Sequence, residues 1–121
     1  MSTHALLNAF KASKPAFGAW VTAPGFFHAR TVALSSPHMS WIALDCEHGL
    51  IPLSLGAAES VAAITSIKTP SPPSPLIRIP ATGVSASTSW QIKYALDAGA
   101  KGVIVPMARF NSPIDARSSI V

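Results

Sequence analysis

The chain has 121 residues, which is enough for one domain with a hydrophobic core and too few for two. Hydrophobic residues make up 49% of it and charged residues 12%, which excludes a disordered chain and predicts apolar surface that a partner or further structure must cover. The basic residues behind the net charge of +4 are scattered from Lys11 to Arg117, so we expect no nucleic-acid partner.

The sequence shows no pattern typical of a signal peptide or of a membrane span. The N-terminal residues lack the basic start and long apolar stretch of a signal peptide, and no segment approaches the roughly 20 apolar residues of a membrane span. The single cysteine, Cys46, excludes an internal disulfide and is typical of a reducing compartment. We therefore expect a cytoplasmic protein with no membrane partner.

Short β-branched runs alternate with longer helical stretches, which is typical of strand–helix units around a parallel sheet. The pattern predicts an N-terminal helix over Ala5–Ser13 and a first strand over Phe17–Val21. Pro24 suits the first turn of a helix that runs to about Ser35, and Trp41–Leu44 predicts the second strand.

The next third of the chain is divided by prolines. Pro52 favours the start of a third helix, whose predicted buried face is Leu53, Ala57, Val61 and Ile64. Four prolines in Thr69–Pro75 exclude a helix and predict an extended surface connection. A third strand is expected over Leu76–Ile79.

After the third strand the sequence predicts a helix, a fourth strand and a further helix. A small, polar stretch at Gly83–Ser89 leads into a helix over Trp90–Ala98, ended by Gly99. Its predicted buried face is Ile92, Ala95 and Leu96, with Lys93 and Asp97 paired on the solvent side. Gly102–Val105 is the fourth strand, and Pro113–Val121 is a possible further helix.

Four strands, each followed by a helix, form either an open doubly wound sheet or a closed eight-stranded barrel. An open sheet would be expected to carry a glycine-rich phosphate turn after the first strand, and Trp20–Gly25 provides none. We therefore predict an α/β fold that is a partial TIM (β/α)8 barrel, with about four parallel strands.

In such folds reactive groups gather at the carboxyl ends of the strands. The second strand ends in Leu44–Gly49, which holds Asp45, Glu47 and His48. An imidazole there can move a proton near neutral pH, and a nearby carboxylate can fix its tautomer. A solvated loop with a helix-capping acid explains the same spacing.

An arginine interrupts the apolar third strand at Arg78. Its planar guanidinium suits the carboxylate of a 2-oxo acid, and a pair with a structural acid is the alternative. Among the other candidates, Lys93 is expected to be a surface residue and Cys46 a small buried one. His4, His28 and His38 are expected to be surface or capping residues, because none has a second ligand at metal spacing.

Three blocks of sequence, Trp41–Gly49, Ile77–Pro80 and Gln91–Met107, resemble the HpcH/HpaI aldolase family in order and spacing. The resemblance implies a metal-dependent barrel that reversibly cleaves a hydroxy-2-oxo acid into pyruvate and an aldehyde. It assigns His48 as the acid/base group, Asp45 as the residue that orients it, and Arg78 as the group that binds the carboxylate and stabilises the enolate. Glu47 matches the motif without an assigned role. Asp97 matches a residue that assists the base from a neighbouring subunit.

The resemblance also implies a divalent cation, Mg²⁺ or Mn²⁺, held by a glutamate and an aspartate on strands beyond Val121. Asp115 corresponds to neither ligand. We therefore expect residues 1–121 to be the N-terminal half of the barrel, impaired in catalysis and forming a homo-oligomer. The alternative is a non-catalytic fragment that associates with full-length paralogues.

Overall fold

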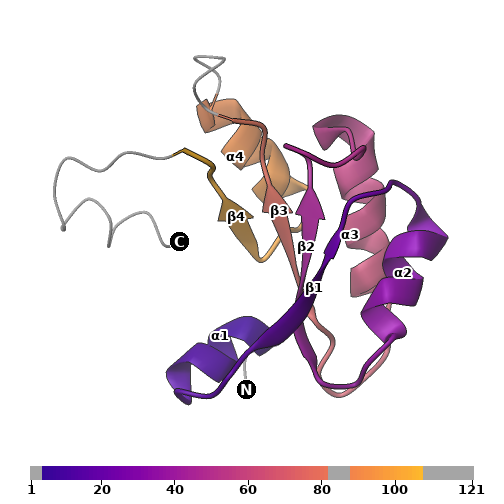
Figure 1. Cartoon of the computed structure of the whole chain (residues 1–121), viewed down its shortest axis with the longest axis vertical. Helices are drawn as coiled ribbons and strands as arrows, with labels where there is room; N and C mark the ends of the chain where they lie inside the picture. The colour runs from indigo at the N-terminus through magenta and orange to yellow at the C-terminus, as the bar shows by residue number, and fades with distance from the viewer. Residues whose placement is uncertain (1–3, 82–87, 108–121) are drawn as a thin grey trace, which may run out of the picture.

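A computed structural model describes residues 4–81 and 88–107 of the chain. Four strands, β1 (Phe17–Val21), β2 (Met39–Asp45), β3 (Ser74–Arg78) and β4 (Gly102–Ile104), form one parallel sheet in the order β1-β2-β3-β4 (Figure 1). Consecutive strands are neighbours throughout, as in the wall of a (β/α) barrel. The predicted α/β fold with about four parallel strands is confirmed.

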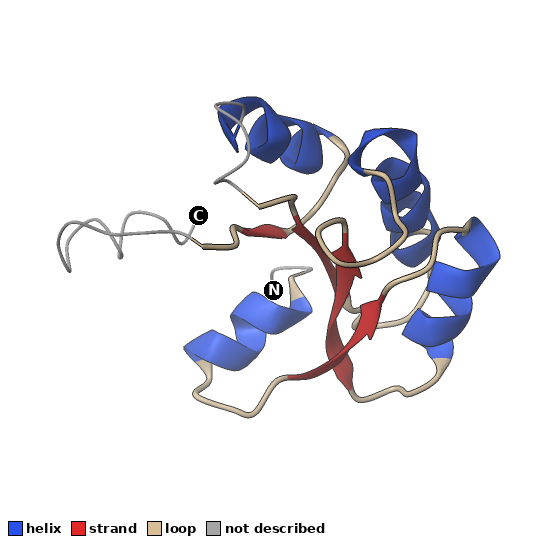
Figure 2. Cartoon of the chain, turned by 45° about the horizontal axis from the view of Figure 1, so that its top comes forward, coloured by secondary structure: helices blue, strands red, loops and turns tan. Residues whose placement is uncertain are grey.

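Three helices follow strands, and one precedes them. These are α2 (Phe26–Leu34), α3 (Ala58–Thr65), α4 (Thr88–Asp97) and, at the N-terminus, α1 (Ala5–Lys11). Figure 2 shows α2, α3 and α4 along one side of the sheet and α1 on the other. The sheet therefore has a helix-covered face and a face that, among the described residues, carries only α1.

The hydrophobic core lies between the sheet and α2–α4. Ile42, Leu44 and Ile77 point to that side and are fully buried. Because side chains alternate along a strand, Trp41, Ala43 and Asp45 point to the opposite face of β2. That alternation selects which strand-end residues reach the less covered side of the sheet.

Helix α1 is fixed to the amino-terminal end of β3. Ser74 Oγ lies 2.9 Å from His4 Nδ1, and it accepts a hydrogen bond from the Leu6 N–H at 3.3 Å. His4 also accepts the Leu7 N–H at 3.2 Å, so it caps the helix as expected. These contacts place α1 away from the carboxyl ends of the strands.

Several predicted boundaries were wrong in the first half of the chain. The first helix ends at Lys11, and Ser13 has a positive φ of 51°. Pro24 lies before α2 instead of within it, because Gly25 occupies the N-cap with a φ of 125° that a side chain would strain. Strand β2 extends beyond the predicted segment to Met39 and Asp45.

The helix predicted at Pro52 begins later than expected. Leu53–Ala57 forms an irregular turn, η1, because Ser54 and Leu55 have non-helical backbone angles, and α3 starts at Ala58. The predicted face of Leu53, Ala57, Val61 and Ile64 is nevertheless buried throughout. The apolar spacing therefore identified the buried side but not the break between the two segments.

Pro75 was predicted to be in a surface loop, yet it lies in β3 and is buried. Its carbonyl accepts the Lys101 N–H at 2.7 Å, on the side of β4. The Pro75 nitrogen, which carries no hydrogen, faces the same side. Pairing between β3 and β4 begins only at Leu76, so β4 offers no acceptor at this position and no ladder hydrogen bond is lost.

The last described elements differ from prediction by one or two residues. Helix α4 begins at Thr88, and β4 ends at Ile104 instead of Val105. Ala95 is buried as predicted, but Leu96 is exposed and Gln91 takes a buried position. Gly99 has the expected positive φ. Most of the linker Gly83–Ser89 and the whole segment Pro113–Val121 lie outside the described residues.

Helices of membrane-spanning length and apolarity do not occur in the described part of the chain.

Candidate functional site

The carboxyl ends of β2 and β3 meet in register. Asp45 is the register partner of Arg78, and the Cys46 N–H donates to the Arg78 carbonyl at 3.0 Å. Register partners in a parallel sheet share a face, so both side chains point away from the helix-covered core. The rim of the sheet thus brings together the two strand-end residues singled out from the sequence.

Asp45 and Arg78 form a two-point ion pair. Arg78 Nη2 donates to Asp45 Oδ2 at 2.6 Å, and Arg78 Nε donates to Oδ1 at 3.0 Å. Oδ1 also accepts the backbone N–H groups of Glu47 and His48, each at 3.0 Å. The Arg78 guanidinium, with help from these N–H groups and against the effect of burial, holds the pKa of Asp45 well below its usual range.

Asp45 therefore positions His48 through the main chain. The carboxylate beside the imidazole is that of Glu47, whose Oε2 lies 3.5 Å from His48 Nε2. The same Oε2 lies 3.4 Å from Arg78 Nε. The Glu47 side chain is only 10% exposed, whereas that of His48 is 74% exposed.

Arg78 also stacks on an aromatic ring. Its Cζ lies 4.7 Å from the ring centroid of Trp20, which comes from β1, and Trp20 packs edge-on against Trp41. The guanidinium is thus held by Asp45 at one edge and by an indole on one face, which fixes its plane. Its side chain remains 24% exposed, and Nη1 has no hydrogen bond to another described residue.

The loop that carries His48 is fastened to the end of β1. The Leu50 N–H donates to the Thr22 carbonyl at 2.7 Å. A Cβ added to Gly49 would lie 2.3 Å from the Asp45 carbonyl oxygen and 2.9 Å from that of Thr22. Only glycine fits between these backbones, so the loop has little freedom to move His48.

The remaining candidates lie outside this cluster. Asp97 is on the exposed side of α4 and pairs with Lys93, as the spacing predicted. Cys46 is buried, and burial together with the charge of Asp45 raises the pKa of its thiol to about 11. Such a thiol is a poor nucleophile near neutral pH.

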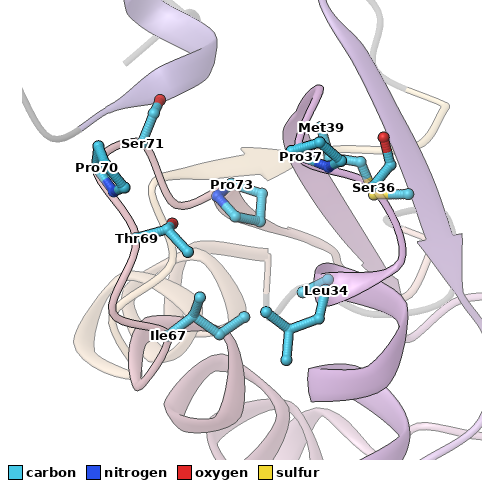
Figure 3. Close-up of a pocket in the computed structure, with 10 residues that line it drawn as sticks. Leu34, Ser36, Pro37, Met39, Ile67, Thr69, Pro70, Ser71 and Pro73 are labelled. Carbon is cyan, nitrogen blue, oxygen red and sulfur yellow. The ribbon is translucent and has the colours of Figure 1, made fainter.

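A separate hollow of about 440 Å³ lies toward the amino ends of the strands (Figure 3). Leu34, Met39 and Ile67 line it together with the prolines of the loop before β3. The described residues that line it carry no charge. They include none of the rim cluster, which consists of Asp45, Glu47, His48 and Arg78. It is therefore distinct from the rim cluster in position and in chemistry.

The described residues of the rim do not form a metal site. Within residues 4–81 and 88–107, no group of three or more histidine, cysteine or acidic side chains could hold a cation. Both Asp45 oxygens accept from Arg78, and Glu47 faces the same guanidinium. A divalent cation does not fit among these groups.

The chain is similar to two proteins named hydroxypyruvate/pyruvate aldolase. It is 32% identical over 100 residues to the one from Agrobacterium fabrum, which is 83% of this chain and 33% of the relative. It is 31% identical over 105 residues to the one from Paraburkholderia phytofirmans, which is 86% of this chain and 36% of the relative. No family model matches the chain.

The chain thus spans about a third of the length of the curated relatives that it matches. In each case more than four fifths of the chain takes part in the similarity. These matches support a relation to proteins of the pyruvate aldolase type.

Proposed function

We propose that this chain is part of a carbon–carbon lyase of the metal-dependent pyruvate aldolase type, as in the HpcH/HpaI family. The reaction would be the reversible cleavage of a hydroxy-2-oxo acid into pyruvate and an aldehyde. One observation carries the proposal: a guanidinium from β3 and an imidazole from the loop after β2 flank the same carboxylate oxygen at one rim of the sheet.

Arg78 supplies the binding group in this proposal. Its fixed plane suits the carboxylate of a 2-oxo acid, and so does its Nη1, which makes no hydrogen bond to another described residue. Its positive charge also favours negative charge that develops on the 2-oxo oxygen during the reaction. Asp45 keeps the guanidinium in place and does not itself exchange a proton, since its pKa is held low.

His48 supplies the proton transfer. In the cleavage direction the imidazole takes the proton of the substrate hydroxyl, the carbon–carbon bond breaks, and its electron pair remains on the pyruvate fragment as an enolate. The aldehyde leaves, and the protonated imidazole then returns a proton to the enolate carbon to give pyruvate. The high exposure of the ring leaves it accessible to a substrate.

The Mg²⁺ or Mn²⁺ that such lyases use would polarise the 2-oxo group. The described rim residues do not fit such a cation, so Arg78 and His48 are the groups that this chain itself supplies. A cytoplasmic location, where small 2-oxo acids are metabolised, is part of the same proposal.

The test is the exchange of the pyruvate methyl protons in D₂O, followed by proton NMR with Mg²⁺ or Mn²⁺ present. This exchange reports enolate formation and needs no aldehyde. We expect slow exchange, above the protein-free rate, that His48→Ala reduces to the protein-free rate. An equal rate in the wild type and His48→Ala would exclude His48 as the base.

A second function is favoured by the sheet edges. Within the described residues β1 and β4 each pair with one strand only, and Phe17 and Trp20 on β1 are exposed. Such edges can pair with another chain. The alternative is therefore a non-catalytic protein that associates with longer paralogues. Co-purification with such a paralogue, without methyl exchange by this chain alone, would favour it.

A further inference from the structure

We propose that Glu47 is the positioning residue for the His48 imidazole: its carboxylate receives Nε2–H, so Nδ1 is the ring atom that exchanges the substrate proton. The part of this inference that concerns a substrate rests on the proposed function. The part that concerns the ring does not, because it depends only on Glu47 and His48. Asp45, to which the family resemblance assigns this task, acts on the loop instead.

The hydrogen bonds of Asp45 leave it no role at the ring. Its two oxygens accept from Arg78 Nη2 and Nε and from the N–H groups of Glu47 and His48. Four donors occupy most of the acceptor capacity of a carboxylate. These interactions include no contact between the Asp45 side chain and the imidazole, so within the described residues Asp45 does not set the tautomer of His48.

Glu47 is placed to set it. Its Oε2 lies 3.5 Å from His48 Nε2, within ion-pair range although longer than a good hydrogen bond. Such contacts in free enzymes are often long and shorten when the substrate binds. Arg78 Nε lies 3.4 Å from the same oxygen, and the side chain is nine-tenths buried. The guanidinium therefore holds the carboxylate at a fixed point beside the exposed ring.

The geometry selects one tautomer of the neutral ring. An anionic carboxylate oxygen is only an acceptor, so the ring nitrogen that faces it carries the proton. Nε2 faces Glu47, which leaves the lone pair on Nδ1. The charged groups around the ring in the described residues are Glu47 and, beyond it, Arg78 and Asp45.

The alternative hypothesis is that Glu47 only neutralises the charge of Arg78 and does not affect the imidazole. In that case a change at Glu47 would alter the binding of a carboxylate by Arg78 but not the state of the imidazole. The two readings therefore differ in a measurement on the ring itself.

The test is the two-bond proton–nitrogen NMR correlation spectrum of the imidazoles in the whole 121-residue chain, recorded where the rings are neutral. The chain has four histidines, and His48→Gln identifies the signals of His48. We expect Nε2–H to be the major form in the wild type. Glu47→Gln should lower the ratio of Nε2–H to Nδ1–H about threefold, a size typical of exposed ion pairs.

The chain offers a matched control. Glu59 is the only other glutamate, and it accepts the Phe26 N–H on another part of the rim. Glu59→Gln removes the same charge and should leave the His48 ratio unchanged. Glu47→Asp keeps the charge on a side chain that is one methylene shorter, and it should give an intermediate ratio. It also serves as the second variant if Glu47→Gln does not fold.

Two results would overturn the inference: Nδ1–H as the major form in the wild type, or the same ratio in the wild type, Glu47→Gln and Glu47→Asp. Neither depends on turnover. If the ratio behaves as expected and the wild type shows no methyl exchange, the lyase proposal fails while the positioning role of Glu47 stands.

Discussion

Asp45 and Arg78 end adjacent strands in register and join their side chains in a two-point ion pair beside the indole of Trp20. The same aspartate accepts the N–H groups of Glu47 and His48. A single buried carboxylate therefore fixes both the guanidinium and the loop that carries the imidazole. The stability of the site and its geometry depend on the same residue.

We predict that Asp45→Asn destabilises the chain by about 2 kcal/mol at neutral pH, because it leaves a partly buried guanidinium without its charged partner. The free energy of unfolding from urea titration measures the loss. Asp97→Asn is the control, since its pair with Lys93 is exposed, and it should change stability little.

The difference between the wild type and Asp45→Asn should depend on pH. The pKa of Asp45 is lower in the folded chain than its ordinary value of 3.8, mainly because of Arg78. The unfolded chain therefore takes up the proton first as pH falls, and the stabilisation, complete above about pH 5, declines below pH 4. A difference that is constant from pH 7 to pH 3 would contradict this assignment.

Cys46 should resist alkylation in the folded chain. Burial, and secondarily the charge of Asp45, raises the pKa of its thiol from 9.0 to about 11. At pH 8 the thiolate fraction is then about a hundredfold lower than for an ordinary thiol, so iodoacetamide should react about a hundredfold more slowly. The rate should rise up to about pH 11. Mass spectrometry follows the reaction, and the urea-unfolded chain gives the reference rate; equal rates in both states would contradict the prediction.

The strand-end residues were predictable from the sequence because parallel strands carry their functional groups at one rim. Asp45, His48 and Arg78 were found in this way, and the structure brings all three to that rim. The position of Glu47 between the ring and the guanidinium was not predictable, since spacing along a loop does not say which of two carboxylates turns toward an imidazole. The contact of Trp20 with Arg78 depends on the register of β1, which composition does not fix.

The errors in the fold have local causes. Pro24 and Pro52 predict helix starts, but each helix begins later. Gly25 occupies the N-cap of α2, and the irregular turn at Ser54 and Leu55 precedes α3. The four prolines of Thr69–Pro75 predict a surface loop, yet Pro75 pairs with Ile42 in β3 at a position where no N–H is required. These three errors concern boundaries, and the order of the described elements was right. The exposure of Leu96 is a different error, since Gln91 takes the buried position on α4 instead.

Leu55 offers a test of strain. Its φ of 64° and ψ of −55° are those of a rare, strained turn, and its side chain is 81% exposed. Leu55→Gly removes little buried surface and relieves the strain, so we expect a gain of about 1 kcal/mol in the free energy of unfolding. Ser54→Gly, at a neighbouring exposed position with negative φ, should lower stability instead. A loss in Leu55→Gly as large as that in Ser54→Gly would show that Leu55 is not strained.

The exposed edge of β1 is expected to make the chain associate. Within the described residues β1 pairs only with β2, and Phe17 on this edge strand is 68% exposed. Unpaired edges with apolar side chains favour association, so we expect the 121-residue chain to be a dimer or larger by light scattering. Phe17→Lys places a charge on the edge and should shift the chain toward the monomer. Phe27→Lys makes the same change on α2, where the side chain is also exposed but no strand edge is involved, and should leave the size unchanged. A wild type that is monomeric and melts cooperatively would show that the edge is not an association surface.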